Sequence, residues 1–275
     1  MTRTPDSGTR AAAPGEGPRT AVPGEGPQAS ALGDGPRPAA LGDGPRPAAL
    51  ADGPRTAGSG DGPRVAVLGA GKVGTVLARL AVAAGRPTAI AGSGDPTALG
   101  LIVDVLAPGA TPMWAADAAA QADIVIVAVP LARLETVPAA ALRGRIVVDV
   151  MNYWPPVDGV LSQWENATRS SSEIVRDVLG VDVVKSFNHM GYHELDAWTR
   201  PAGDPDRRAL ALAGDDPATV GVVAELVDAM GFDPVPLHPL GAGHVLQPGS
   251  SDIFGANLTR AELLATLESV APANT

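Results

Sequence analysis

The chain of 275 residues contains no cysteine. Disulfide bonds, zinc–thiolate sites, thiol nucleophiles and cysteine-bound iron–sulfur clusters are therefore excluded. No apolar run reaches the ~18 residues that a membrane-spanning helix needs, so no membrane partner is expected. The N-terminus also lacks a hydrophobic secretory segment, which makes the cytoplasm the expected location.

Positive charge is scarce in this chain. Lys and Arg number 20 against 30 Asp and Glu, which gives a formal net charge of −10. The only lysines are Lys72 and Lys185. So acidic a chain is not expected to bind nucleic acid over a broad surface. It can still bind an anionic small molecule, because backbone N–H groups and a few cations suffice for that.

Residues 1–63 are repetitive and differ from the rest of the chain. An acidic residue followed by Gly-Pro recurs every nine residues, at Glu16, Glu25, Asp34, Asp43, Asp52 and Asp61. Proline removes backbone donors, and few large apolar side chains are present to bury. A calcium-binding β-roll also has a period of nine, but proline in every repeat would interrupt its ladders. We therefore expect residues 1–63 to be a disordered tail.

The motif around which the remaining chain is organised begins at residue 64. An apolar strand over Val65–Leu68 runs into a Gly-x-Gly-x-x-Gly turn, and an alanine-rich helix is predicted over 72–84. A dinucleotide-binding turn requires this context, whereas the turn alone also occurs in other α/β proteins. Its three glycines serve the tight turn, the approach of a pyrophosphate, and helix–strand packing. The expected cofactor-binding residues are Gly69, Ala70, Gly71, Lys72, Val73 and Gly74.

Strand and helix patterns alternate beyond this turn, which predicts a parallel sheet with helices on its faces. Further strands are expected near 87–91, 111–114, 123–129, 145–150, 181–187, 208–213 and 235–237. Further helices are expected near 97–106, 115–121, 131–142 with a disturbance at Pro138, 170–179 and 217–230, and from 259 onward. The predicted fold is α/β, a Rossmann-type, doubly wound, mainly parallel sheet. It comprises a dinucleotide-binding domain over 64–180 and a smaller C-terminal portion over 181–275, which completes the sheet and the acceptor pocket.

Ligands of open α/β sheets bind beyond the carboxyl ends of the strands. This rule selects residues 69–74, 92–95, 129–130, 151–154 and 188–191. Ser93 stands at the tip of the second strand, where NAD-binding turns usually carry a carboxylate for the ribose 2′-hydroxyl. A serine does not repel a 2′-phosphate, so the sequence favours NADP. Asp95 is expected to cap the following helix.

The hydride acceptor is expected to be a flat, redox-active molecule. Two stacked rings shielded from water can exchange a hydride through positioning alone. An alcohol dehydrogenase would need an acid or a base, but Tyr153 is followed by Trp-Pro-Pro, so no helical Tyr-x-x-x-Lys exists. No catalytic side chain is therefore assigned. His189 and His193 lack an obvious third ligand, so a pocket-lining or packed histidine is expected rather than a metal site.

Two further residue types have structural expectations. Lys185 falls in a predicted buried strand and is expected to be a solvent-exposed or strand-end charge. Trp114, Trp164 and Trp198 are expected to pack, and Trp154 is the exception because it follows a strand end.

Residues 64–260 resemble the F420-dependent NADP reductases and the wider group of NADP oxidoreductases that shares their domain. The resemblance rests on residues 65–74, 91–94, 124–130, 170–175 and 183–190. It implies hydride exchange between NADPH and the deazaflavin coenzyme F420. It implies that the glycine turn and Ser93 bind NADP and that Pro130, with Val129 beside it, lies along the nicotinamide. It also implies that Asn188, His189 and Met190 border the acceptor.

Two alternatives remain open at this point. The first is an NADPH-dependent reductase whose acceptor is a flavin, a quinone or a ferric chelate. A non-catalytic NADP(H)-binding sensor would keep the glycine turn and lack a pocket for a second ring. In either reading the partner is a small molecule, and a homodimer is one candidate assembly.

Overall fold

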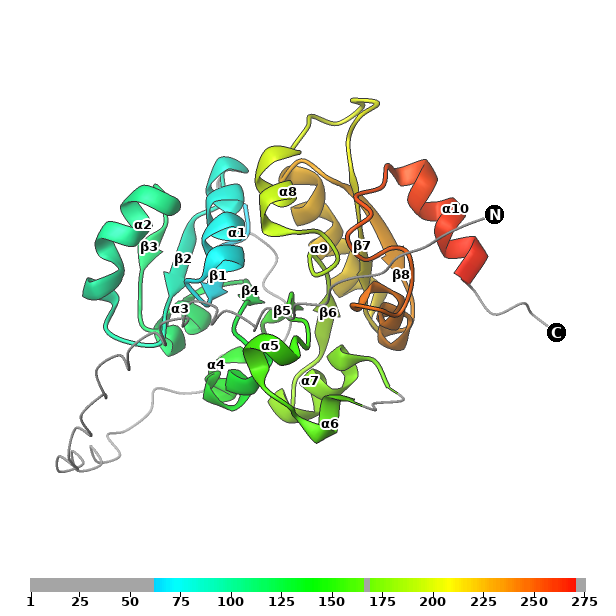
Figure 1. Ribbon diagram of the computed structural model, residues 1–275. Helices are drawn as coiled ribbons and strands as arrows, with labels where there is room; N and C mark the ends of the chain where they lie inside the picture. Colours follow the sequence, from blue (N-terminus) through cyan, green and yellow to red (C-terminus); the bar gives the residue numbers. More distant parts are fainter. Residues whose placement is uncertain (1–61, 166–168, 271–275) are drawn as a thin grey trace, which may run out of the picture. The chain divides into compact units, whose positions relative to one another are not determined.

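The structure, a computed structural model, describes residues 62–165 and 169–270 (Figure 1). The expected disordered tail lies outside the described residues, apart from Gly62 and Pro63. One sheet of eight strands organises the described part, in the order β3-β2-β1-β4-β5-β6-β7-β8. The strands are β1 (Val65–Leu68), β2 (Thr88–Ala91), β3 (Thr111–Pro112), β4 (Ile124–Val127), β5 (Ile146–Asp149), β6 (Val183–Lys185), β7 (Ala209–Ala213) and β8 (Asp233–Leu237).

The sheet has the doubly wound arrangement that the sequence predicts. Strands β1 to β6 are parallel and follow the order 3-2-1-4-5-6 of a Rossmann fold. β7 pairs antiparallel with β6, and β8 is parallel to β7. The sheet therefore continues from β5 to β6 across residue 180. Pro234 and Pro236 lie in β8, an edge strand, where a missing N–H is tolerated.

Helices and 3₁₀ turns connect these strands. The α-helices are α1 (Lys72–Ala83), α2 (Gly100–Leu106), α3 (Ala115–Gln121), α4 (Ala139–Leu142), α5 (Pro155–Asp158), α6 (Ser162–Glu165), α7 (Ser171–Leu179), α8 (Tyr192–Ala197), α9 (Pro217–Ala229) and α10 (Arg260–Val270). The 3₁₀ helices are η1 (Pro96–Leu99), η2 (Leu131–Thr136) and η3 (Leu240–Leu246). Within the described ranges, every helix is too short or too polar to cross a bilayer.

Alternating residues of the central strands divide the core between the two faces of the sheet. Val65, Val67 and Ile126 pack with side chains of α1, α8 and α9 on one face. Ala66 and Val125 pack with α3, α4 and α7 on the other. A third cluster joins β7 and β8 to α10. Because both faces of the central strands are covered, these strands are apolar throughout, as the run after Asp123 predicts.

Local capping signals in the sequence are confirmed. Ser170 and Glu173 form a reciprocal capping box at α7, and Gly180 ends that helix with φ of 64°. Asp216 accepts hydrogen bonds at the start of α9. Asp95 caps η1, as expected, by accepting from the Thr97 N–H at 2.8 Å. These groups satisfy backbone donors and acceptors that a helix end leaves free.

The disturbance expected at Pro138 is confirmed, because the helical stretch over 131–142 is divided there into η2 and α4. Three short helices were not predicted. The segment 155–165, which carried no helical pattern, contains α5 and α6, and α8 follows β6 directly. Each of these missed helices has four to six residues, which is too short for the 3.6-residue period to be visible.

Candidate functional site

A cleft of about 680 Å³ lies beyond the carboxyl ends of β1, β2 and β4. Its wall includes most of the expected cofactor-binding residues, namely Gly69, Ala70, Gly71, Ser93, Val129 and Pro130. They come from the glycine turn, the tip of β2 and the end of β4. The parallel sheet brings these three segments together because β1 lies between β2 and β4.

The first and third glycines of the turn are required by the fold itself. Gly69 has φ of +123°, and its N–H donates to Ala91 O at 2.8 Å. A Cβ atom there would overlap the Ala128 carbonyl, and one at Gly74 would overlap the Gly69 carbonyl. Gly74 thus allows α1 to pack closely against the end of β1, as the sequence predicts.

The second glycine faces open space. Among the residues that the structure describes, none has an atom within 4 Å of the position that a Cβ atom of Gly71 would occupy. Gly71 is the N-cap of α1, no side chain caps the first turn, and that turn has no acidic residue. The first N–H groups of α1 and the positive end of its dipole are therefore available to an anion. This fits the pyrophosphate of a dinucleotide.

The other three expected cofactor-binding residues, Lys72, Val73 and Gly74, form the first turn of α1 and do not line the cleft. Lys72 is exposed, and its Nζ is 5.4 Å from the centre of the Tyr192 ring on α8. Val73 lines a second pocket rather than the cleft. Gly74 is buried between α1 and β1 and serves packing. The side chains of Lys72 and Val73 point away from the cleft because α1 turns by about 100° per residue after Gly71.

The second pocket, of about 320 Å³, lies around the ends of β5 and β6. It contains the three residues expected to border the acceptor, Asn188, His189 and Met190, together with Val73, Asn152 and Phe254. Since Gly71 lines the cleft and Val73 lines this pocket, the N-terminus of α1 separates the two hollows. The ends of the neighbouring strands β4 and β5 contribute one wall to each.

An amide pair joins the two strand ends at this pocket. Asn152 Nδ2 donates to Asn188 O at 2.7 Å, and Asn188 Nδ2 donates to Asn152 Oδ1 at 3.0 Å. Asn188 Nδ2 also donates to Leu246 O at 2.6 Å. Asn188 Oδ1 is buried and has no hydrogen-bond partner among the described residues. The pair therefore fixes the pocket wall and leaves one acceptor unused.

His189 is packed, which is one of the two roles expected for it. Its Nε2 accepts from the Ala211 N–H at 3.0 Å. Burial lowers the pKa of His189 to about 4, and the positive charge of Lys185 acts in the same direction. The imidazole is therefore neutral near pH 7 and holds β7 against the end of β6. The described residues contain no group of three His, Asp or Glu side chains that suits a metal ion.

Lys185 is the last residue of β6, so the expected strand-end charge is confirmed, whereas the alternative of a solvent-exposed charge was wrong. Its side chain is 1% exposed, and its Nζ lies 3.2 Å from Oδ2 of Asp149, which is 0% exposed. Nζ also donates to Met151 O. Asp149 accepts from Met151 N at 2.9 Å and from Ser172 Oγ at 2.7 Å. Burial lowers the pKa of Lys185, and the Asp149 charge opposes the shift.

Several residues of the cleft were not identified from the sequence. Trp114 was expected to pack, but it is 54% exposed and lines the cleft after β3. Arg133, Thr136 and Val137 line it from η2 and the residue after it. No motif marks these positions, and only the neighbouring strand ends bring them to the glycine turn.

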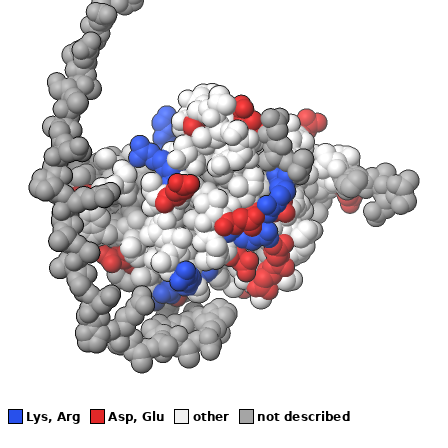
Figure 2. Space-filling model, turned by 90° about the horizontal axis from the view of Figure 1, so that it is seen from below, with Lys and Arg blue, Asp and Glu red and all other residues white. Residues whose placement is uncertain are grey.

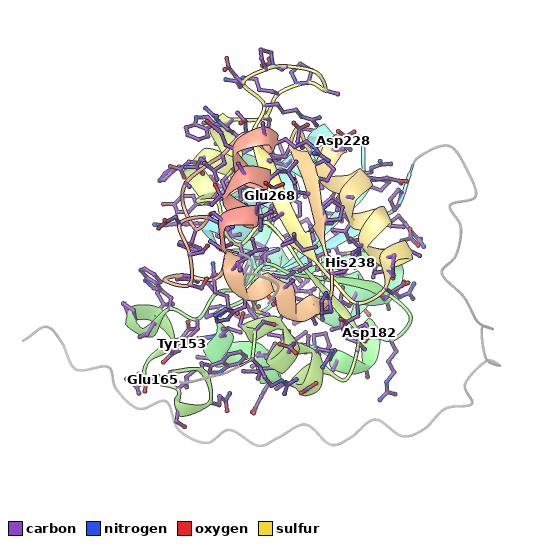
Figure 3. All side chains as sticks on the ribbon, turned by 90° about the vertical axis from the view of Figure 1, so that its right-hand side faces the viewer. Tyr153, Glu165, Asp182, Asp228, His238 and Glu268 are labelled. Carbon is purple, nitrogen blue, oxygen red and sulfur yellow. The ribbon has the colours of Figure 1, made fainter. Side chains whose placement is uncertain are left out.

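The loop after β5, residues 152–156, carries Tyr153 and Trp154 and is joined to η2 through hydrogen bonds to Asp158. Asp158 accepts from Ala132 N on η2 at 3.1 Å and from Trp154 N at 2.8 Å. Tyr153 and Glu165 both line a third hollow. They lie near each other at one end of the molecule, whereas Asp228 lies at the other (Figure 3). Trp154 remains 48% exposed. On the face of the molecule shown in Figure 2, basic side chains lie beside acidic ones.

The comparisons with known proteins agree with this geometry. Residues 64–153 match the family model described as NADP oxidoreductase, coenzyme F420-dependent. The hypothetical protein SMa0349 of Sinorhizobium meliloti is 32% identical, with a TM-score of 0.60, over 72% of this chain and 95% of that one. A candidate F420-dependent NADP reductase of Arthrobacter sp. FB24 is 27% identical, with a TM-score of 0.55, over 66% and 88%.

No curated protein matches the sequence. The family model covers β1, the glycine turn and the ends of β2 and β4. These segments line the cleft. The SMa0349 protein is similar over nearly its whole length. The chain therefore resembles the family described as NADP oxidoreductase, coenzyme F420-dependent, and is an NAD(P)-dependent oxidoreductase.

Proposed function

We propose that this protein transfers a hydride between NADP(H) and the deazaflavin coenzyme F420. The observation that supports this most is the pair of adjoining hollows, of about 680 and 320 Å³, on either side of the α1 N-terminus. Two molecules that exchange a hydride must bring their rings into contact, and each needs its own binding surface. A dinucleotide sensor would need only the first hollow.

The residues present suit positioning rather than acid–base chemistry. When bound, NADPH supplies the hydride, and reduction of F420 also takes up one proton, so the products are NADP⁺ and reduced F420. In this proposal the α1 N-terminus binds the pyrophosphate, and Val129 and Pro130 form the wall along the nicotinamide. Asn188, His189 and Met190 then form the floor beneath the acceptor. His189 contributes shape, since its neutral imidazole is already hydrogen-bonded to β7.

The polar wall of the second pocket also favours a ring with hydrogen-bonding groups. Asn152, which is half-buried, and Asn188 contribute side-chain amides to this wall. The pyrimidine ring of a deazaflavin carries N–H and C=O groups that can hydrogen-bond to an amide. Val150, Met190 and Phe254 add apolar surface against which a flat ring can pack.

Preference for NADP over NAD is supported by the tip of β2. Ser93 and Gly94 line the cleft there, and the described part of the chain contributes no carboxylate to its lining. Asp95 lies outside the lining, and its Oδ1 accepts from both the N–H and the hydroxyl of Thr97 at 2.8 Å. A 2′-phosphate at this position therefore meets no negative charge from the cleft wall.

The test is an absorbance assay of the purified protein with NADPH and F420, in which both chromophores are followed. We expect NADPH and F420 to be consumed in equal amounts. Reduction of a flavin, a quinone or a ferric chelate, with F420 left unchanged, would refute the acceptor and retain the reductase activity. Tight NADPH binding without turnover of any acceptor would refute hydride transfer and favour a nucleotide sensor.

A further inference from the structure

Arg133 is the only charged residue among the described residues that line the cleft. The other cleft residues are apolar or neutral, including Ser93, Trp114 and Thr136. NADP(H) carries two negative charges on its pyrophosphate and about two more on its 2′-phosphate. Because the described wall of this cleft contains one cation, we expect that cation to contact one of these phosphate groups.

The backbone that carries Arg133 is firmly placed. Its N–H donates to Pro130 O at 2.8 Å, and its carbonyl accepts from Thr136 Oγ1 at 2.7 Å. The flanking Leu131 and Leu134 are buried. Arg133 therefore stands on the exposed side of η2, while the other side is anchored in the core. Its guanidinium makes no hydrogen bond or ion pair with the described residues.

The two cations of α1 are directed elsewhere. Lys72 lies over the Tyr192 ring, and Arg79 binds Leu106 O and Asp196. The pyrophosphate is served by the backbone N–H groups of the α1 N-terminus, which no side chain caps. The 2′-phosphate has only the Ser93 hydroxyl at the tip of β2. It is the phosphate that lacks a charged partner.

We propose that Arg133 binds the 2′-phosphate of NADP(H) and so selects NADP over NAD. β1 lies between β2 and β4, so the cleft has the Ser93 tip on one side and η2 on the other. Arg133 and Ser93 both line this one cleft. A guanidinium is suited to bidentate binding of phosphate oxygens. The specificity residue thus follows β4 instead of β2. This inference rests on the proposed binding of NADP(H) in the cleft.

The test measures dissociation constants of NADPH and NADH for Arg133→Gln, Arg133→Lys and the parent. Arg143→Gln is the matched control, because it removes one exposed arginine charge outside the cleft. For Arg133→Gln we expect NADPH binding to weaken tenfold or more and NADH binding by less than about twofold. Arg133→Lys is expected to recover part of the NADPH affinity, and Arg143→Gln to match the parent.

Adenosine 2′,5′-bisphosphate and ADP serve as probes of the two phosphate positions. Arg133→Gln is expected to weaken the bisphosphate and to leave ADP unchanged. Equal weakening of NADPH and NADH, or of both probes, would assign Arg133 to the pyrophosphate or the adenine and overturn the proposal. Unchanged NADPH affinity would overturn it as well. In both cases the parent still binds and oxidises NADPH, so the proposed function stands. A parent that binds neither cofactor would overturn both.

Discussion

Replacing Lys185 by methionine is expected to destabilise the fold by about 3 to 5 kcal/mol, because it removes one partner of a buried ion pair. Asp149 would keep the hydrogen bonds from Met151 N and Ser172 Oγ but would lose its positive partner while remaining 0% exposed. The Met151 carbonyl would lose a donor as well. Since a domain is stable by about 5–15 kcal/mol, the loss is a large fraction of the total.

The magnitude is tested by urea unfolding of five proteins, namely the parent, Lys185→Met, Asp149→Asn, the double variant and a control, with the midpoint and slope fitted for each. Lys72→Met is the control, since Lys72 is the only other lysine and is exposed; its stability should change by less than about 1 kcal/mol. The double variant Lys185→Met with Asp149→Asn removes both charges. It should be at least about 1 kcal/mol more stable than Lys185→Met alone.

Two results would refute this reasoning. If Lys185→Met were within about 1 kcal/mol of the parent, the ion pair would not contribute as its burial implies. If the double variant were as unstable as the sum of the single variants, the two side chains would not be coupled. A stable double variant also allows F420 turnover to be measured. We expect turnover to fall more than NADPH affinity, because Met151 leads into Asn152 at the second pocket.

Three further predictions concern the cleft and the core. The pKa of His189 is lowered to about 4 from 6.5, so the neutral, buried imidazole contributes fully to folding stability above pH 6.5, and about 3 kcal/mol of this stability is lost as the pH falls toward 4. The free energy of unfolding, measured against pH, should lose this pH dependence in His189→Gln. An unchanged pH profile in that variant would contradict the assignment. Gly74→Ala should lower stability by about 1–3 kcal/mol, because the new Cβ overlaps the Gly69 carbonyl, whereas Gly71→Val should retain the melting temperature and lose NADPH binding; equal melting temperatures for the two variants would argue against this assignment. Ser93→Asp should shift the ratio of kcat/KM values toward NADH by repelling the 2′-phosphate, and a constant ratio would place the ribose elsewhere.

Much of the fold could be predicted because its signals are local. The apolar run before Pro130 specifies a strand covered on both faces, and the structure buries Ile124 to Val127 completely. Ser170 and Gly180 mark the ends of α7 through groups that bond to their own helix. The glycine turn was also predictable. The atoms that exclude a Cβ atom at Gly69 and Gly74 are the Ala128 carbonyl, at the end of the neighbouring strand, and the Gly69 carbonyl of the turn itself.

Other features depend on partners distant in the sequence. The orientation of β7 follows from pairing with β6, and only one residue pair joins the two strands. The four-residue α5 is fixed by Asp158, which binds the backbone of η2 some 26 residues away. A pattern that repeats over a few residues cannot encode such contacts.

The sequence by itself determined the Rossmann-type order of elements, the position of the glycine turn and the strand ends that line the cleft. These follow from hydrophobic periodicity, caps and glycine sterics, which act within a few residues. Only the tertiary structure decided the surroundings of individual side chains. It buried Lys185 against Asp149, exposed Trp114 in the cleft, turned Lys72 away from it and brought Arg133 into its wall. The physical reason is that burial and electrostatic pairing depend on which segments the sheet brings together.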